Sequence, residues 1–139
     1  MTLDTTRADA LGCYGGSPEV TPHLDRLARE SVRFDQARSV APLTLPAHAS
    51  MFTGLYPPRH GVHDNGVAVL GESYTTLAER ARERGAATAA VVAANVLDRA
   101  FGLEQGFEHW TQPASGAELS AREVFGAGAR WLARRDRAR

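Results

Sequence analysis

Residues 41–57 read Ala-Pro-Leu-Thr-Leu-Pro-Ala-His-Ala-Ser-Met-Phe-Thr-Gly-Leu-Tyr-Pro, and the fold is most readily predicted outward from this stretch. It predicts a short helix over about 46–53, because Pro46 suits a first helical turn and Gly54 suits the position just past the end. Thr44 then lies at or next to the helix N-terminus, with His48 one turn further on. Free N–H groups and the positive dipole end stabilise anions at such a terminus.

Upstream of this helix the sequence predicts two strands and another helix. Residues 1–3 read as the end of a buried strand and are followed directly by Asp4. Thr21 and Pro22 are a typical N-cap and first helical residue, and the apolar side chains that follow predict one buried face. Those side chains are Leu24, Leu27 and Ala28. Residues 32–37 alternate between larger and polar side chains, which predicts a half-exposed strand.

Downstream, Thr75 or Thr76 is expected to cap a helix that ends at Gly85. Residues 86–94 are ambiguous, because their alanines favour helix while their uniform apolarity favours a buried strand; we predict a strand. Residues 95–117 are expected to form a loop that carries Phe107 and Trp110, and a last helix is expected over about 119–135.

This alternation of strands and helices predicts an α/β fold with a parallel sheet flanked by helices. Ligands of such sheets gather at the carboxyl ends of the strands, which directs attention to Asp4 and to the loop 41–48. Three or four strands are few for a complete sheet of this kind. We therefore expect residues 1–139 to be a piece of a larger α/β domain, truncated at both ends.

Composition excludes several classes of function. The 139 residues carry 16 basic and 16 acidic side chains, so no net charge favours nucleic acid or an anionic membrane. Every basic residue is Arg, which excludes a P-loop lysine or a Schiff-base lysine. The single cysteine, Cys13, excludes an internal disulfide and a cysteine zinc cage. No apolar run is long enough to span a membrane.

Taken one at a time, the candidate residues also have plain structural explanations. Thr44 can be a simple N-cap, Asp4 a turn residue after a strand, and His48 a half-buried polar residue of the helix. The remaining features are most simply loop and core residues: the turn Asp64-Asn65-Gly66, the loop cysteine Cys13, the spaced pair His60 and His63, and the aromatic residues Trp110 and Trp131.

Taken together, the segments resemble the sulfatase family of the alkaline phosphatase superfamily. The similar stretches follow one another in order along nearly the whole chain. They are 4–9 (Asp-Thr-Thr-Arg-Ala-Asp), 11–15 (Leu-Gly-Cys-Tyr-Gly), 21–28 (Thr-Pro-His-Leu-Asp-Arg-Leu-Ala), 32–34, 41–57, 59–62, 64–66 and 101–107. The resemblance implies that residues 1–139 are the N-terminal fragment of a hydrolase domain that acts on sulfuric or phosphoric esters.

The resemblance also implies roles for particular residues. Asp4 matches the first metal ligand of the family, whereas Thr5 stands where a second Asp is usual. Thr44 stands where the signature Cys-x-Pro-Ser-Arg has the Cys that becomes formylglycine, and Thr cannot be converted in that way. Ala47 and His48 also depart from that signature. Related phosphodiesterases and phosphoethanolamine transferases use Thr as the nucleophile at a metal centre, which favours phosphoryl or phosphonoxy chemistry.

By this resemblance Thr44 and His48 are the expected catalytic residues, and Asp4 and Thr44 the expected ligands of a divalent metal ion (Ca, Zn or Mn). The family's remaining ligands come from an Asp-His-Gly-like stretch that is absent from residues 1–139. A hard cation needs about six oxygen ligands, so we expect the 139-residue chain alone to be inactive. The expected substrate is a small-molecule, glycan or lipid ester, and export or membrane anchoring is left open.

Two other classes of function stay open from the sequence. One is a degenerate, non-catalytic domain kept for binding or protein interaction, in which Thr44 and His48 serve structure only. The other is an ordinary small α/β binding module, which the abrupt first strand disfavours. A piece of a larger domain should expose sheet edges and apolar surface, so we also expect the isolated chain to aggregate or to bind a hydrophobic dye.

Overall fold

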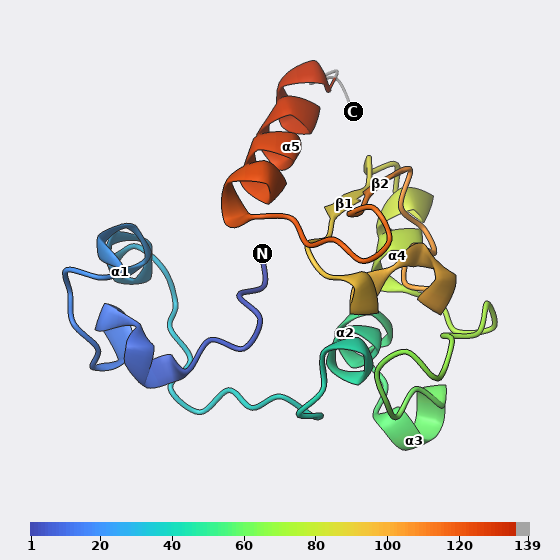
Figure 1. The fold of residues 1–139 in the computed structure, drawn as a ribbon, viewed down its shortest axis with the longest axis horizontal. Helices are drawn as coiled ribbons and strands as arrows, with labels where there is room; N and C mark the ends of the chain where they lie inside the picture. Colours follow the sequence, from blue (N-terminus) through green and yellow to red (C-terminus); the bar gives the residue numbers. More distant parts are fainter. Residues whose placement is uncertain (136–139) are drawn as a thin grey trace. The chain divides into compact units, whose positions relative to one another are not determined.

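A computed structural model describes residues 1–135 of the 139. The chain divides into two compact units, the first covering Met1–Ser39 and the second beginning at Val40. The ribbon of Figure 1 shows the first unit in blue and the second from cyan to red. Each unit has its own elements and its own stabilising contacts, and each is described separately.

The first unit is organised around a buried carboxylate. Its helix α1 (Pro22–Arg29) follows two short 3₁₀ helices, Ala8–Ala10 and Gly12–Tyr14. Asp25 Oδ1 accepts a hydrogen bond from the Cys13 N–H (2.8 Å) and one from the Thr21 hydroxyl (3.1 Å), while Thr21 Oγ1 accepts from the Gly12 N–H (2.9 Å). A Cβ at Gly12 would lie 2.1 Å from Asp25 Oδ2, so this close approach requires glycine.

Three predictions for the first unit are wrong. Residues 1–3 and 32–37 contain no strand. Leu27, which was expected on the buried face of α1, is 57% exposed, and the buried residue of α1 is Asp25. The predicted start of α1 is confirmed, with Thr21 at the N-cap position and Pro22 as the first helical residue. A strand exists only when another strand pairs with it, and within the described residues neither segment has such a partner.

Up to residue 135 the second unit contains four α-helices: α2 (Thr44–Thr53), α3 (Pro57–His60), α4 (Leu77–Glu83) and α5 (Ala121–Arg134). Thr76 and Ser120 begin α4 and α5 with capping boxes, in which each side chain accepts from a Glu N–H three residues on. The predicted helices near 46–53, 76–85 and 119–135 are thus confirmed, whereas α3 was not predicted. Two short 3₁₀ helices, Asn95–Leu97 and Arg99–Phe101, follow the first strand.

Two strands form a sheet in the described part of the second unit. β1 (Ala89–Val91) pairs in parallel with β2 (His109–Thr111), and Ala90 lies opposite Trp110. This confirms a strand within 86–94 and the parallel pairing, but the prediction of loop throughout 95–117 is wrong because it missed β2. Helix α5 packs against β1.

An apolar core holds the second unit together. Its buried members come from α2, the segment after α3, and the residues around the 3₁₀ helices: Leu45, Ala49, Val62, Leu70, Leu97 and Leu103. Phe52, Phe107 and Trp110 extend it as a chain of tilted rings, with centroids 5.6 and 5.5 Å apart. No helix of the described residues is long and apolar enough to cross a lipid bilayer.

Candidate functional site

The N-terminus of α2 places the candidate nucleophile. Thr44 is the first residue of the helix, two residues earlier than the predicted start, and Leu43 is the residue before it. The helix ends at Gly54, whose φ of +71° is the left-handed conformation expected there. Leu45 and Ala49 are fully buried, which anchors one face of α2 in the core. The half-buried Thr44 therefore lies at the positive end of a firmly packed helix.

His48 lies one turn along α2 and is buried. Its Nδ1 lies 2.8 Å from the Thr44 carbonyl oxygen. A carbonyl oxygen only accepts, so we assign a ring proton to Nδ1. The edge of the ring also faces Phe52, with the ring centroids 6.2 Å apart. The structure thus ties His48 to the residue that carries the candidate nucleophile.

Asn65 is a residue of the site that sequence reasoning missed. The Leu45 N–H donates to Asn65 Oδ1 at 2.9 Å, so a side chain twenty residues away caps the first turn of α2. Asn65 was predicted to be part of a plain turn, and the turn is present. No local signal indicated this contact, because Thr44 was itself a candidate N-cap in the sequence, whereas in the structure the N-cap is Leu43, which makes no side-chain hydrogen bond.

A second hydrogen bond joins the last residue of α3 to the second half of α2. His60 is 2% exposed, and its Nε2 lies 2.8 Å from Ser50 Oγ. Its Nδ1 accepts the Val62 N–H at 3.1 Å. Burial lowers the pKa of His60 and the charge of His63 lowers it further, so the ring is held neutral. His60 is thus a buried residue whose two ring nitrogens both have hydrogen-bond partners.

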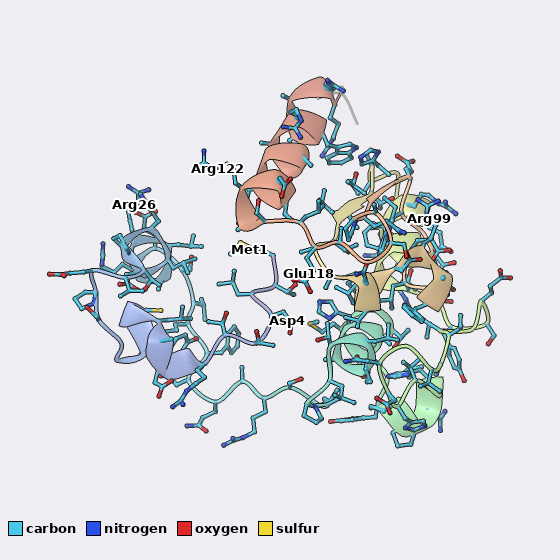
Figure 2. The ribbon with its side chains drawn as sticks, in the orientation of Figure 1. Met1, Asp4, Arg26, Arg99, Glu118 and Arg122 are labelled. Carbon is cyan, nitrogen blue, oxygen red and sulfur yellow. The ribbon has the colours of Figure 1, made fainter. Side chains whose placement is uncertain are left out.

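Asp4 is exposed and belongs to the first unit, on the irregular segment that precedes the 3₁₀ helices; Figure 2 labels it. Its Oδ1 accepts the Thr5 N–H at 2.9 Å. Thr5 has φ +53°, and among the described residues no other non-glycine residue has a positive φ. This conformation is unfavourable for a β-branched side chain. Asp4 is therefore followed by a strained backbone.

The two expected metal ligands do not make a metal site by themselves. Asp4 and Thr44 belong to different units, and both are oxygen donors of the kind that hard cations prefer. Within residues 1–135 no group of three or more His, Cys, Asp or Glu side chains is arranged to hold a metal ion. Asp4 and Thr44 are suited to a hard cation, but the described residues alone do not provide a complete metal centre.

The fold and the position of Thr44 define the class of protein. It is an α/β domain with a parallel sheet and with a hydroxyl residue at the start of a helix that packs into the core. The family model of the sulfatases matches residues 1–125. The chain belongs to the sulfatase family. The sequence resemblance on which this was predicted is confirmed.

Two relatives show how the similarity is distributed. Mouse steryl-sulfatase is 45% identical over 91 residues, which are 58% of this chain and 15% of that protein. The N-acetylglucosamine-6-O-sulfatase of Bacteroides thetaiotaomicron is 32% identical over 111 residues, which are 80% of this chain and 19% of that protein. The chain thus spans less than a fifth of the length of these relatives.

Solved structures confirm the fold class. A protein whose structure was solved in complex with its substrate D-glucosamine-2-N,6-O-disulfate superposes on 94% of this chain with a TM-score of 0.75 and 23% identity, and the match covers 30% of that protein. A 2-O GAG sulfatase superposes on 85% of this chain with a TM-score of 0.66, 22% identity and 25% coverage of its own chain. The predicted partial, alkaline-phosphatase-like α/β fold is therefore correct.

Proposed function

We propose that residues 1–139 supply the nucleophile-bearing part of a sulfatase-family ester hydrolase or transferase, and that Thr44 is its nucleophile. The observation that carries this proposal is the place of Thr44 as the first residue of α2, a helix packed into the core through Leu45 and Ala49. Backbone N–H groups and the helix dipole at that end favour an anionic ester group next to the hydroxyl.

The chemistry is a double displacement. Thr44 Oγ attacks the phosphorus, a Thr–O–P bond forms, the ester P–O bond breaks, and the leaving alcohol takes up the proton that the hydroxyl gives away. Water, or an acceptor alcohol in a transferase, then displaces the Thr44 oxygen, which regains a proton. We propose that His48 contacts the anionic group or moves a proton through Nε2, since Nδ1 is engaged by the Thr44 carbonyl.

The identity of residue 44 favours phosphoric over sulfuric esters. We propose an anionic ester of a lipid or a glycan as the substrate, and the similarity to proteins named steryl-sulfatase and N-acetylglucosamine-6-O-sulfatase supports this choice. A secondary or primary alcohol side chain forms a phosphoester directly, whereas the formylglycine route needs a Cys or Ser that position 44 lacks.

We further propose that Asp4 and Thr44 contribute two oxygen ligands to a divalent ion and that the other ligands come from sulfatase-domain segments outside these 139 residues. When bound, such an ion supplies Lewis-acid polarisation of the ester and lowers the pKa of the nucleophile. The acidic and hydroxyl donors of the chain suit a hard cation rather than a thiolate-preferring one. The 139-residue chain alone is accordingly proposed to be inactive.

The test compares Thr44→Ala, Thr44→Ser and Thr53→Ala in the complete natural gene product that carries this sequence. Turnover of aryl phosphate monoesters, phosphodiesters, phosphonate esters and sulfates is measured with added divalent ions. We expect Thr44→Ala to lower phosphoester turnover by about 1,000-fold or more, Thr44→Ser to retain part of it, and Thr53→Ala, at the other end of α2, to retain most of it.

Two outcomes would contradict the proposal. Unchanged phosphoester turnover in Thr44→Ala would remove the nucleophile role, and absence of any turnover in the unmodified gene product would favour a non-catalytic binding domain. Metal-dependent turnover by the isolated 139-residue chain, lost in Thr44→Ala, would contradict the proposed inactivity of the chain while supporting Thr44 as nucleophile.

A further inference from the structure

Helix α2 begins without a capping side chain of its own. The first N–H groups of any helix lack partners within that helix, and a Ser, Thr, Asp or Asn at the N-cap usually accepts one of them. Here the N-cap is Leu43, which makes no side-chain hydrogen bond. The Leu45 N–H instead donates to Asn65 Oδ1 at 2.9 Å. The cap of α2 therefore comes from another segment of the chain.

The same segment contacts α2 at a second point. Because Nδ1 of His60 accepts the Val62 N–H, its Nε2 carries the proton and donates to Ser50 Oγ at 2.8 Å. Both His60 and Ser50 are buried, so breaking this bond would leave polar groups without water to replace it. Ser50 lies in the second half of α2, more than one turn beyond the residue that Asn65 caps.

The segment between the two points is itself fixed. Val62 is fully buried in the core beside Leu45 and Ala49. Gly61 adopts φ +76°, which reverses the chain at the end of α3. Asp64 Oδ1 accepts the Asn65 N–H at 2.7 Å and so orients the backbone of the capping residue. A buried apolar anchor thus lies between two polar contacts that hold the same helix.

We propose that residues 60–65 are a positioning clamp for α2, in which Asn65 replaces the missing N-cap and His60 holds Ser50 through Nε2. The clamp sets the orientation of the first turn of α2, the turn that begins with Thr44 and is followed by His48. Asn65 and His60 are positioning residues in this arrangement, and their effect on catalysis rests on the proposed function.

The clamp is tested first without any substrate, by hydrogen exchange of backbone amides in the ¹⁵N-labelled 139-residue chain. Asn65→Ala should make the Leu45 amide exchange roughly 10-fold faster, because loss of a cap frees the first turn. Amides near Thr53 should change less. Asn65→Asp keeps an oxygen acceptor and should retain the protection of Leu45.

Asn95→Ala is the matched control, since Asn95 is also half-buried and its 3₁₀ helix packs against α2. Unchanged Leu45 exchange in Asn65→Ala would overturn the clamp, and so would an equal acceleration in Asn95→Ala. Exchange measured by mass spectrometry on peptides spanning 43–50 gives the same comparison where spectra of a variant are not resolved. The ¹⁵N shifts of the His60 ring provide a second readout: a proton on Nδ1 at neutral pH would also overturn the clamp.

The catalytic consequence is measured separately in the complete gene product. Asn65→Ala should lower kcat about 10-fold with a smaller change in KM, because the orientation of the nucleophile changes while the binding groups remain. A fall in kcat/KM that arises from KM alone would contradict a positioning role. If Thr44→Ala leaves turnover unchanged, the proposed function fails, and the exchange of Leu45 still decides whether the clamp exists.

Discussion

The two units of this chain are stabilised by different means. Residues 1–39 are organised by a buried carboxylate, Asp25, and several large apolar side chains of this unit are exposed, among them Val32 (82%) and Phe34 (70%). The unit that begins at Val40 has an apolar core with Leu45 at 0% exposure. The comparison shows that hydrogen bonds define the conformation of the first unit, whereas burial of apolar area provides most of the stability of the second.

We expect the greatest loss of stability when a side chain of the apolar core of the second unit is shortened. Leu45→Ala removes a fully buried side chain and should lower the free energy of unfolding by about 2–5 kcal/mol. Leu27→Ala makes the same chemical change at an exposed position of the first unit and should cost less than about 1 kcal/mol. Chemical denaturation followed by circular dichroism measures the free energy of unfolding of each variant. Equal losses in the two variants would contradict the view that only the second unit is stabilised mainly by apolar burial.

A smaller effect is expected when the carboxylate of the first unit is removed. Asp25→Ala leaves the Cys13 N–H and the Thr21 hydroxyl without their acceptor, at a cost of about 1–3 kcal/mol. Asp9→Ala is the control, because Asp9 forms an exposed ion pair with Arg7, and such pairs contribute about 0–1 kcal/mol. Protection of the Cys13 amide from hydrogen exchange is the local readout. Retained protection in Asp25→Ala would show that backbone packing, not the carboxylate, holds this unit.

Acid should destabilise the second unit through His60. Its folded pKa is lowered, so the unfolded chain binds the proton more readily than the folded one. The contribution of His60 is complete above the ordinary histidine pKa, near 6.5, and declines as the pH falls through the lower folded value. Below that pKa a proton on Nδ1 would oppose the Val62 N–H. Unfolding of the wild type and of His60→Gln at several pH values tests this, and parallel pH profiles would exclude His60 as the titrating group.

Elements with a local sequence signal could be predicted, whereas elements that depend on distant partners were predicted less well. Helices were found where the signal is local: the Thr21-Pro22 start of α1, Gly54 after α2, and the Thr76 cap of α4. Strands were less reliable, because pairing partners are distant in sequence. The segment 86–94 was assigned correctly from its apolarity, whereas β2 was missed and the strand at 32–37 is absent.

In the candidate site too, features set by neighbouring residues were predicted, and contacts between distant residues were not. The place of Thr44 at the start of α2 followed from Pro46 and Gly54, which lie within the helix or directly after it. The cap from Asn65 and the bond between His60 and Ser50 could not be predicted, because each joins residues ten or twenty positions apart. Side-chain contacts across such separations depend on the path of the intervening chain, here the unpredicted helix α3.

The smallest change in stability is expected when exposed apolar side chains of the first unit are replaced. Val32 and Phe34, with Leu3 and Leu24, line an apolar cleft of about 370 Å³ in that unit. Replacing Val32 and Phe34 by Ser should change the free energy of unfolding by no more than about 0.5 kcal/mol per residue, because both side chains are largely exposed. Binding of a hydrophobic dye should nevertheless fall, since the cleft is the apolar surface that these residues form.

Val67→Ser is the control for that experiment, because Val67 is also exposed but belongs to the second unit and lies outside this cleft. Dye fluorescence that falls in the Val32 and Phe34 variant but not in Val67→Ser would assign the exposed apolar surface to the first unit. Equal fluorescence in all three proteins would mean that the dye binds elsewhere, and a loss of several kcal/mol on replacing Val32 and Phe34 would show that the first unit buries them. Either result would remove the contrast between a unit organised by hydrogen bonds and a unit organised by its apolar core.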